Sequence, residues 1–452
     1  MSIFRAYDIR GTYPKDLNEE VAFKVGAAFA QINLGKIAVG CDARLSSPSL
    51  KEKLIDGLTL GGVNAVDIGM VTTPMLIFSV SFYKLDGGIM ITGSHNPKEY
   101  NGIKFFTKNS MPISYESGLN KIESMVKIGR FHKVARHGEV ESKDVSEDYK
   151  NYLLSKIKFK SQPKMKIVVD AGNGSSGKIH SDILRKVGIE VVEMNCEPDG
   201  NFPNHLPDPL EPENVVDLQK RVVEENADMG LAYDGDGDRV VVIDEKGKTT
   251  SINDIFVLLI KHTLQNFKNS KIIYNVSNSL AVKDTIEKYG GIPIEYKVGH
   301  TYVQQTMKNE NAQFGGELSG HYFFKETFTG DDAIFASLKL LEFLINNSTS
   351  LEKEFAEIPR YYSMVSEDIV VPVKDSEKFI FIENLKNELK NKGYRINDVD
   401  GVKVLFDDGW ALFRASNTTP LIRYGFESKT QDGFEKIKDF VEGVLEKIPK
   451  DG

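Results

Sequence analysis

The feature that most constrains the fold is a strand, helix and strand pattern that occurs three times along the chain. Each copy opens with a short β-branched run, at Lys36 (KIAVG), Lys166 (KIVVD) and Lys271 (KIIYN). A polar loop of small residues, a helical stretch and a glycine turn into another apolar strand follow each run. Strands that alternate with helices favour parallel βαβ units, covered on both faces, with ligands at the carboxyl ends of the strands. The sequence therefore predicts three α/β domains of similar plan, although the copies share a pattern rather than identity.

After about Pro359 the pattern changes to that of a smaller α+β domain. A charged amphipathic stretch at 377–392 is followed by two strand-like runs, at 402–406 and 410–414, and by a final helix from about 431 to 447. A chain of 452 residues is long enough for three or four domains. We predict four domains, at residues 1–150, 151–250, 251–360 and 361–452.

Charge and hydropathy exclude several classes of protein. The formal charge of −8, from 57 basic and 65 acidic residues, argues against a nucleic-acid binder, which needs a basic face. The longest apolar run, Ile255 to Ile260, is too short to span a membrane, and the charged N-terminus lacks a signal-peptide core. We expect a cytoplasmic protein with no nucleic-acid or membrane partner. Cys41 and Cys196 lack CxxC spacing, so we expect both to be reduced and at least partly buried.

The first candidate site is the turn TGSHNP at 92–97, which follows an apolar run that ends at Ile91. The neighbours of Ser94 are small or turn-forming, so we expect its hydroxyl to be exposed, and we expect Lys104 to supply a cation for an anion in this loop. This setting suits a nucleophilic serine. A hydrolase would need a G-x-S-x-G elbow, whereas here the glycine is adjacent to the serine and Pro97 stops an elbow helix. Taken alone, such a segment is more often only a turn.

The second candidate site is the run DGDGDR, in which Asp234, Asp236 and Asp238 alternate with glycines between two apolar runs. Alternating carboxylates on a curled backbone point hard oxygen ligands at one centre, and without a cation they would repel one another. An EF-hand is the rival interpretation, but it needs glycine where this chain has Arg239, and helices where the flanks indicate strands. Three carboxylates suit Mg²⁺, which takes further ligands from water and phosphate. Arg239 is then available to bind phosphate or sugar.

Two further segments carry weaker patterns. Glu317, Ser319 and His321 alternate in GGELSGH, so their side chains can line one side, as recognition of sugar hydroxyls requires; a turn without function is the simpler interpretation of this segment alone. The segment RASNTTP, from Arg414 to Pro420, combines a guanidinium with hydroxyls, an amide and loop N–H groups. Such a set makes a phosphate cradle, and a capping turn is the alternative.

These four segments, in this order and with FRAYDIRG at 4–11, resemble the α-D-phosphohexomutase family over essentially the whole chain, most closely its bacterial phosphomannomutase/phosphoglucomutase branch. The resemblance implies three related α/β domains with mixed sheets plus a smaller α+β C-terminal domain that acts as a lid, around a central cleft. It also implies the interconversion of hexose 1-phosphate and hexose 6-phosphate, of mannose or glucose, through a phosphoserine and a hexose 1,6-bisphosphate. The implied cofactors are Mg²⁺ and the bisphosphate as activator, and the implied partners are phosphosugars.

The resemblance assigns roles to individual residues. Ser94 becomes the phosphoserine and, with Asp234, Asp236 and Asp238, a ligand of Mg²⁺. The candidates for the general acid/base, which we do not rank, are Lys104, Arg10 and His300. The residues implied in substrate binding are Arg239, Lys297, Glu317, Ser319, His321, Arg414, Ser416, Asn417 and Thr418. One departure is visible, because relatives often have a lysine just after the third-domain strand, where this chain has VSNS at 276–279.

The preferred sugar and the class of function leave alternatives. The segment YFFK at 322–325, which directly follows the GGELSGH segment, and the RASNTTP segment resemble those of dual mannose/glucose enzymes. Phosphoglucosamine mutase is the alternative enzyme. A metal-binding phosphosugar sensor without catalytic activity is the alternative from another class, against which Ser94 argues. We expect a monomer or a homodimer.

Overall fold

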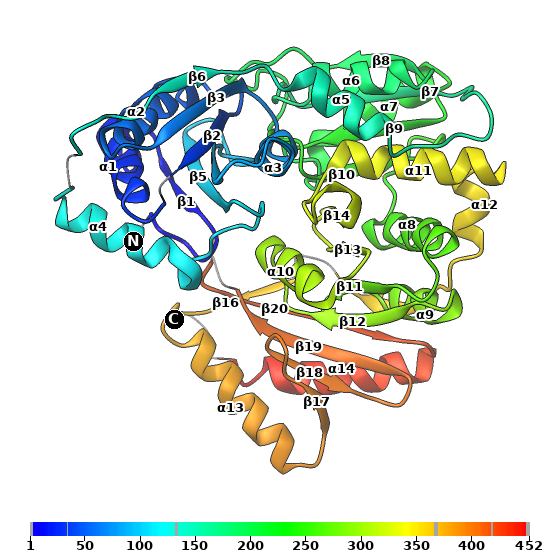
Figure 1. Cartoon of the computed structure of the whole chain (residues 1–452). Coiled ribbons are helices and arrows are strands. Elements are labelled where there is room, and N and C mark those ends of the chain that lie inside the picture. Colours follow the sequence, from blue (N-terminus) through cyan, green and yellow to red (C-terminus); the bar gives the residue numbers. More distant parts are fainter. Residues whose placement is uncertain (1–2, 34, 132–133, 366–368, 417–418, 449–452) are drawn as a thin grey trace. The chain divides into compact units, whose positions relative to one another are not determined.

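The computed structural model describes residues 3–33, 35–131, 134–365, 369–416 and 419–448 (Figure 1). The chain forms two compact units. The first unit comprises residues 1–250 and 320–351, and the second comprises residues 251–319 and 352–452. The division into four domains that we expect from the sequence stays a prediction.

The first sheet of the first unit is mixed, with the strand order β1-β5-β4-β2-β3-β6. Its strands are β1 (Ile9–Thr12), β2 (Lys36–Cys41), β3 (Asn64–Met70), β4 (Gly87–Ile91), β5 (Tyr100–Thr107) and β6 (Val140–Ser142). Strands β4, β2, β3 and β6 run parallel, whereas β5 is antiparallel to both β4 and β1. The predicted parallel unit is therefore present, and β5 returns the chain beside the end of β4, where Ser94 lies.

Helices cover this sheet because its central strands are apolar on both faces. Figure 1 shows α1 and α2 packed together on one side of it. The helices are α1 (Glu19–Ala30), α2 (Ser47–Leu60), α3 (Thr73–Phe82) and α4 (Asn120–Ile128), the last preceded by a π-helical turn (Tyr115–Leu119). All five residues of β4 are buried, as expected for a strand covered on both faces. The resulting core includes Phe29, Leu54 and Ile89.

The second sheet of the first unit has the order β10-β9-β7-β8 and is also mixed. Its strands are β7 (Lys166–Asp170), β8 (Glu190–Met194), β9 (Met229–Tyr233) and β10 (Val240–Ile243), with only β10 antiparallel to its neighbour. The helical elements of this part are α5 (Ser146–Leu154), α6 (Gly177–Lys186), a 3₁₀ turn (Pro212–Val215), α7 (Val216–Glu224) and α11 (Ala333–Asn347). The unit also contains β14 (Tyr322–Phe324) and a 3₁₀ turn (Lys325–Thr327). Strands β9 and β10, entirely buried, hold the aspartate loop between them.

The second unit contains a parallel sheet segment and an antiparallel sheet. Strands β12 (Ile292–Tyr296), β11 (Lys271–Asn275) and β13 (Phe314–Gly316) pair in that order, and their helices are α8 (Ile252–Asn266), α9 (Leu280–Lys288) and α10 (His300–Glu310). The antiparallel sheet has the order β15-β20-β19-β18-β17, and β16 also pairs with β20. These strands are β15 (Tyr362–Met364), β16 (Val370–Pro372), β17 (Arg395–Asn397), β18 (Val402–Leu405), β19 (Gly409–Ala415) and β20 (Leu421–Ser428). Its helices are α13 (Lys378–Asn391) and α14 (Gln431–Leu445), and α12 (Leu351–Ala356) spans the boundary between the units.

The expected fold class is confirmed: three α/β parts, with mixed sheets in the first unit, precede a smaller α+β part. The third strand pattern, at Lys271, forms β11 as predicted. Cys41 and Cys196 are buried and form no disulfide, as expected. Among the described residues, none of the helices combines the length and the apolar character that a membrane span requires.

Candidate active site

Ser94 lies in the loop that joins β4 to β5. Its backbone adopts a left-handed conformation, with φ of 50°. The residue is only 4% exposed, so the exposure expected from its small neighbours is wrong: the aspartate loop covers it. A non-glycine residue holds such a conformation only where the surrounding structure enforces it, and such positions cluster at active sites. The Ser94 N–H donates to Thr92 Oγ1 at 2.8 Å. Nδ1 of His95 lies 3.2 Å from Ser94 Oγ.

Arg44, which sequence reasoning missed, holds this loop. Its guanidinium is buried and donates to four main-chain carbonyls, those of Ser94 (2.8 Å), Asn96 (2.5 Å), Pro97 (2.6 Å) and Tyr100 (2.9 Å). Burial lowers the pKa of Arg44, although Asp42 opposes that shift, and an arginine stays charged even so. A side chain at Gly93 would place its Cβ 2.3 Å from Arg44 Cζ, so only glycine allows this close approach.

Asp42 joins the arginine to the serine loop. Its carboxylate accepts from Arg44 Nε at 3.2 Å and from the Gly93 N–H at 2.9 Å. Both Asp42 and Arg44 follow β2, which is parallel to β4, so the two loops emerge at the same edge of the sheet. The only signal in the sequence was a charged segment directly after a buried strand.

The aspartate loop lies directly against Ser94. Asp234, Asp236 and Asp238 are at most 2% exposed, and each offers a carboxylate oxygen within 4.8 Å of the other two. Ser94 Oγ donates to Asp234 Oδ2 at 3.0 Å. A Cβ on Gly235 would lie 2.5 Å from the Ser94 carbonyl oxygen, so the two loops meet backbone to backbone. The structure thus brings together two segments that the sequence separates by 140 positions.

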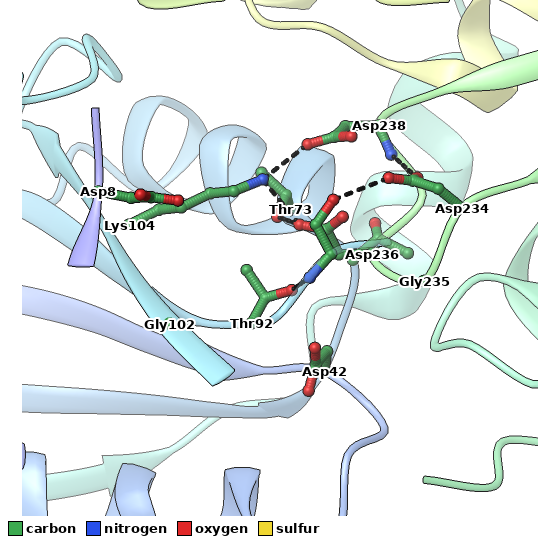
Figure 2. A network of polar contacts seen from close by, with 12 residues as sticks. Asp8, Asp42, Thr73, Thr92, Gly102, Lys104, Asp234, Gly235, Asp236 and Asp238 are labelled. Atoms are coloured by element: carbon green, nitrogen blue, oxygen red, sulfur yellow. Dashed lines mark hydrogen bonds and ion pairs between the residues drawn. The ribbon is translucent and has the colours of Figure 1, made fainter. Parts of the chain in front are cut away.

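Lys104, which we expected beside the serine loop, pairs with the aspartate cluster. Figure 2 shows its side chain directed from β5 at Asp236 and Asp238, and Nζ lies 2.8 Å from a carboxylate oxygen of each. Burial alone would lower the pKa of Lys104, but the two carboxylates outweigh it and the pKa is raised. Burial also raises the pKa of Asp234, with the charges of Asp238 and Asp236 adding to the effect.

The aspartate cluster fits a hard divalent cation. Among the described residues, Asp236 Oδ1 is buried and has no hydrogen-bond partner. An unsatisfied buried carboxylate oxygen is costly unless an ion or water satisfies it. Because all the donors of the cluster are oxygens, the residues suit Mg²⁺ better than a soft metal.

Arg10, Arg239 and His321 complete the polar surroundings of the serine. Arg10 Nη1 donates to the Gly93 carbonyl at 2.5 Å. Arg239 Nε donates to His321 Nε2 at 3.3 Å, and the same ring nitrogen lies 3.3 Å from Asp238 Oδ1. Burial lowers the pKa of His321, and the Arg239 charge adds to that shift. His321, interpreted from the sequence as a sugar contact, therefore lies beside the aspartate loop.

The other predicted substrate residues belong to the second unit. The Gly299 N–H donates to Glu317 Oε1 at 2.6 Å, which links the segment of Lys297 and His300 to the segment of Glu317 and Ser319. Lys297 Nζ lies 5.5 Å from the centre of the Tyr302 ring, and His300 begins α10.

The predicted phosphate cradle also lies in the second unit, at the end of β19. Arg414 is 6% exposed, and its Nη1 lies 4.0 Å from Asp400 Oδ2. Thr419 Oγ1 donates to Ser416 Oγ at 2.7 Å. Asn417 and Thr418 lie outside the described residues.

Asp332, the residue before α11, is a buried carboxylate whose ionisation affects stability. Its carboxylate caps α11 through the Phe335 N–H at 3.0 Å and accepts from the Tyr149 hydroxyl at 2.9 Å. Burial raises its pKa from 3.8 to about 7 against the effect of these bonds. Between pH 4 and 7 the unfolded chain loses this proton while the folded chain keeps it. The free energy of unfolding therefore falls by up to about 4 kcal/mol as pH rises through this range.

We therefore expect Asp332→Asn, which has no such proton, to gain thermal stability relative to wild type as pH rises from 4 to 7, with no further gain above pH 7. Melting temperatures of both proteins across this range measure the difference. Melting curves that shift in parallel at every pH would contradict the assignment.

Comparison with known proteins identifies the family. Four segments match the phosphoglucomutase/phosphomannomutase domains: residues 1–133 match alpha/beta/alpha domain I, 147–247 domain II, 251–362 domain III and 369–444 the C-terminal domain. A phosphomannomutase/phosphoglucomutase of Pseudomonas aeruginosa is 38% identical over 454 residues, which cover 99% of this chain and 96% of the relative. A phosphoglucomutase of Neisseria gonorrhoeae is 36% identical, over 99% and 97% of the two chains.

A solved structure agrees with these sequence matches. The crystal structure of a phosphoglucomutase/phosphomannomutase family protein from Burkholderia thailandensis has a TM-score of 0.90 and 32% identity, and covers 98% of this chain and 97% of that one. The chain belongs to the phosphoglucomutase/phosphomannomutase family, and it is a phosphohexomutase that interconverts hexose 1-phosphates and hexose 6-phosphates.

Proposed function

We propose that this enzyme carries its working phosphate on Ser94 and moves phosphate between the 1 and 6 positions of mannose and glucose. The observation that carries the proposal is the 3.0 Å contact between Ser94 Oγ and Asp234 Oδ2, which places a hydroxyl against the buried aspartate cluster. A phosphoryl group on Ser94 supplies the anionic partner that a metal ion at these carboxylates requires.

The reaction consists of two transfers in opposite directions. First the bond between Ser94 Oγ and phosphorus breaks, a bond from phosphorus to the free hydroxyl of the hexose phosphate forms, and that hydroxyl loses its proton. The resulting 1,6-bisphosphate turns over in the site. Its other phosphoryl group then returns to Ser94 Oγ, and the new sugar hydroxyl takes up a proton. The general acid/base stays a prediction among Lys104, Arg10 and His300.

The cations at the site stabilise the transferring phosphoryl group. Lys104, held by Asp236 and Asp238, places a fixed ammonium at the aspartate cluster that Ser94 contacts, where phosphoryl transfer concentrates negative charge. We propose that Asp234, Asp236 and Asp238, together with the phosphate on Ser94, hold Mg²⁺. When bound, this ion neutralises charge on the phosphoryl oxygens.

We propose that the predicted residues of the second unit bind the sugar and its second phosphate. Glu317 and Ser319 recognise sugar hydroxyls, with Lys297 as a further contact. Arg414 and Ser416, with Asn417 and Thr418, bind the phosphate that is not being transferred. Hexose 1,6-bisphosphate acts as activator because it rephosphorylates Ser94 whenever the intermediate escapes. A cytoplasmic location and a monomeric or homodimeric state stay predictions.

Metal removal tests the proposed ion. Treatment with EDTA is expected to lower kcat at least about 100-fold, because the charge on the transferring group loses its main counter-ion. Added Mg²⁺ should restore activity to wild type but not to Asp236→Asn. A coupled assay measures both, and Asp217→Asn, on the exposed face of α7, is the matched control that should recover fully. Full activity of the metal-stripped wild type would contradict the proposal.

The same coupled assay tests which hexose phosphates are substrates. Turnover of both mannose 1-phosphate and glucose 1-phosphate, in the presence of glucose 1,6-bisphosphate, is the expected result. Strong turnover of glucosamine 6-phosphate with little of mannose 1-phosphate would instead favour a phosphoglucosamine mutase.

A further inference from the structure

The loop that follows β8 lies against two segments of the active site. This β8 loop, residues 195–211, contains neither helix nor strand. A Cβ on Gly200 would lie 2.6 Å from the Ala43 carbonyl oxygen, so the β8 loop meets the segment after β2 backbone to backbone. A Cβ on Gly235, in the aspartate loop, would lie 3.3 Å from Pro207 Cγ. The β8 loop therefore contacts both the segment that supports Ser94 and the loop that carries the aspartates.

Phe202 of the β8 loop packs against the guanidinium that holds the serine loop. Arg44 Cζ lies 5.1 Å from the centre of the Phe202 ring, within the range of a cation–π contact. Phe202 is buried and has φ of 49°, a conformation that a bulky residue adopts only where the surrounding structure enforces it. Other contacts must therefore hold the β8 loop in this position.

Two side chains at the end of β7 provide such contacts. Asn173 Nδ2 donates to the Glu197 carbonyl at 2.8 Å, and Asn204 Nδ2 donates to Asn173 Oδ1 at 2.9 Å. Oδ2 of Asp170, the last residue of β7, lies 3.1 Å from Nε2 of His205. Because β7 and β9 are parallel, Asp170 lies at the edge of the sheet from which the aspartate loop emerges.

His205 makes its contact with Asp170 as a cation. Its Nδ1 lies 2.8 Å from the Leu206 carbonyl oxygen, and Nε2 faces the Asp170 carboxylate. A carbonyl and a carboxylate only accept, so both ring nitrogens carry a hydrogen. Asn195 Nδ2, 3.3 Å from Nε2, donates to the other oxygen of Asp170 at 3.1 Å. Burial alone would lower the pKa of His205. Asp170 outweighs burial, with the Leu206 carbonyl and the charge of Asp217 adding to its effect, and the pKa is raised.

We infer that His205 is a positioning residue for phosphoryl transfer, because its bond to Asp170 holds the β8 loop against the Arg44 segment and the aspartate loop. The inference rests on the proposed phosphoserine mechanism and adds a residue that acts through this loop. A neutral imidazole has only one N–H group, so it cannot donate to Asp170 and Leu206 together. A loosened β8 loop lets the Ser94 loop and the aspartate loop shift against each other, which slows the transfer.

The pH dependence of kcat tests this role. With saturating glucose 1-phosphate and glucose 1,6-bisphosphate, kcat of the wild type is expected to fall as pH rises through the raised pKa of His205. His205→Gln keeps one donor for Asp170 but has no proton that titrates. Its kcat should be about tenfold below wild type at about pH 6, and the two profiles should converge at about pH 9. KM for glucose 1-phosphate should stay within about twofold, because the proposed substrate contacts come from other residues.

Controls separate this role from a purely structural one. His137→Gln replaces an exposed histidine of the same unit and should leave the pH profile unchanged. Hydrogen exchange of wild-type peptides from 195–211 carries the test if His205→Gln does not fold, since their protection should fall over the same pH range as kcat. A ratio of wild-type to His205→Gln kcat that is equal at every pH, or protection that does not change with pH, would overturn this inference alone. Full activity of Ser94→Ala would overturn the proposed function, on which the inference rests.

Discussion

Ser94→Ala is expected to lower kcat on the order of 10⁴-fold or more, because the chain loses the only oxygen through which the proposed double transfer proceeds. The Kd of hexose phosphates should change little, since the proposed substrate contacts come from other residues. A coupled assay with saturating glucose 1,6-bisphosphate measures the loss. Intact mass spectrometry should find one phosphoryl group on the wild type after incubation with the bisphosphate and none on the variant.

The control for this result is another serine of the same unit. Ser124 lies on α4, and its hydroxyl only donates to the Asn120 carbonyl of the preceding turn. Ser124→Ala should keep full activity and the same phosphorylation. Wild-type activity in Ser94→Ala would refute the phosphoserine mechanism, even though the family membership would stand.

Arg44→Met is expected to destabilise the protein by about 3 to 5 kcal/mol, the usual cost of breaking a buried pair. The substitution leaves four carbonyls without their shared donor and Asp42 without its cation. Because these carbonyls shape the Ser94 loop, we also expect kcat to fall at least about 100-fold under conditions in which the variant is folded. Urea unfolding and the coupled assay measure the two effects.

Arg44→Lys distinguishes geometry from charge. A single ammonium has three donors and no planar fork, so it cannot serve four carbonyls at once, and we expect the variant to stay about 2 kcal/mol less stable than wild type. Arg136→Met provides the control, since this exposed arginine pairs with Glu139 and surface changes stay within about 0.5 kcal/mol. Wild-type stability and activity in both Arg44 variants would show that the loop keeps its shape without the guanidinium.

The sequence predicted the parts of this molecule that depend on local pattern. β-branched runs at Lys36, Lys166 and Lys271 form buried parallel strands, since burial on both faces selects such residues. The aspartate loop forms between two strands, as its apolar flanks indicated. The contact between this loop and Ser94 was predicted from chemistry. Closely spaced carboxylates need a cation, and a phosphate on Ser94 would supply the further anionic ligand of that cation.

Contacts made over long distances along the chain could not be predicted in this way. Nothing around Asp42 and Arg44 forms a motif, and their role emerges only when β2 and β4 pair in parallel. The position of His321 beside the aspartate loop could not be predicted either, because side chains that alternate along 317–321 share one side only in an extended strand. In the structure β13 ends at Gly316 and β14 begins at Tyr322, so residues 317–321 lie between strands. A single-sequence pattern does not show where such a connection leads.

The way in which Arg44 holds the serine loop has a consequence for the reaction cycle. Every bond from its guanidinium to the loop goes to a main-chain oxygen, and none goes to the hydroxyl of Ser94. These hydrogen bonds therefore do not depend on whether the Ser94 hydroxyl is free or phosphorylated. In each turnover of the proposed mechanism the serine gives up a phosphate and receives another, and the loop has no need to rearrange between these two states. Because Arg44 does not contact the side chain that the proposal phosphorylates, the loop can keep one conformation through many cycles of phosphorylation and dephosphorylation.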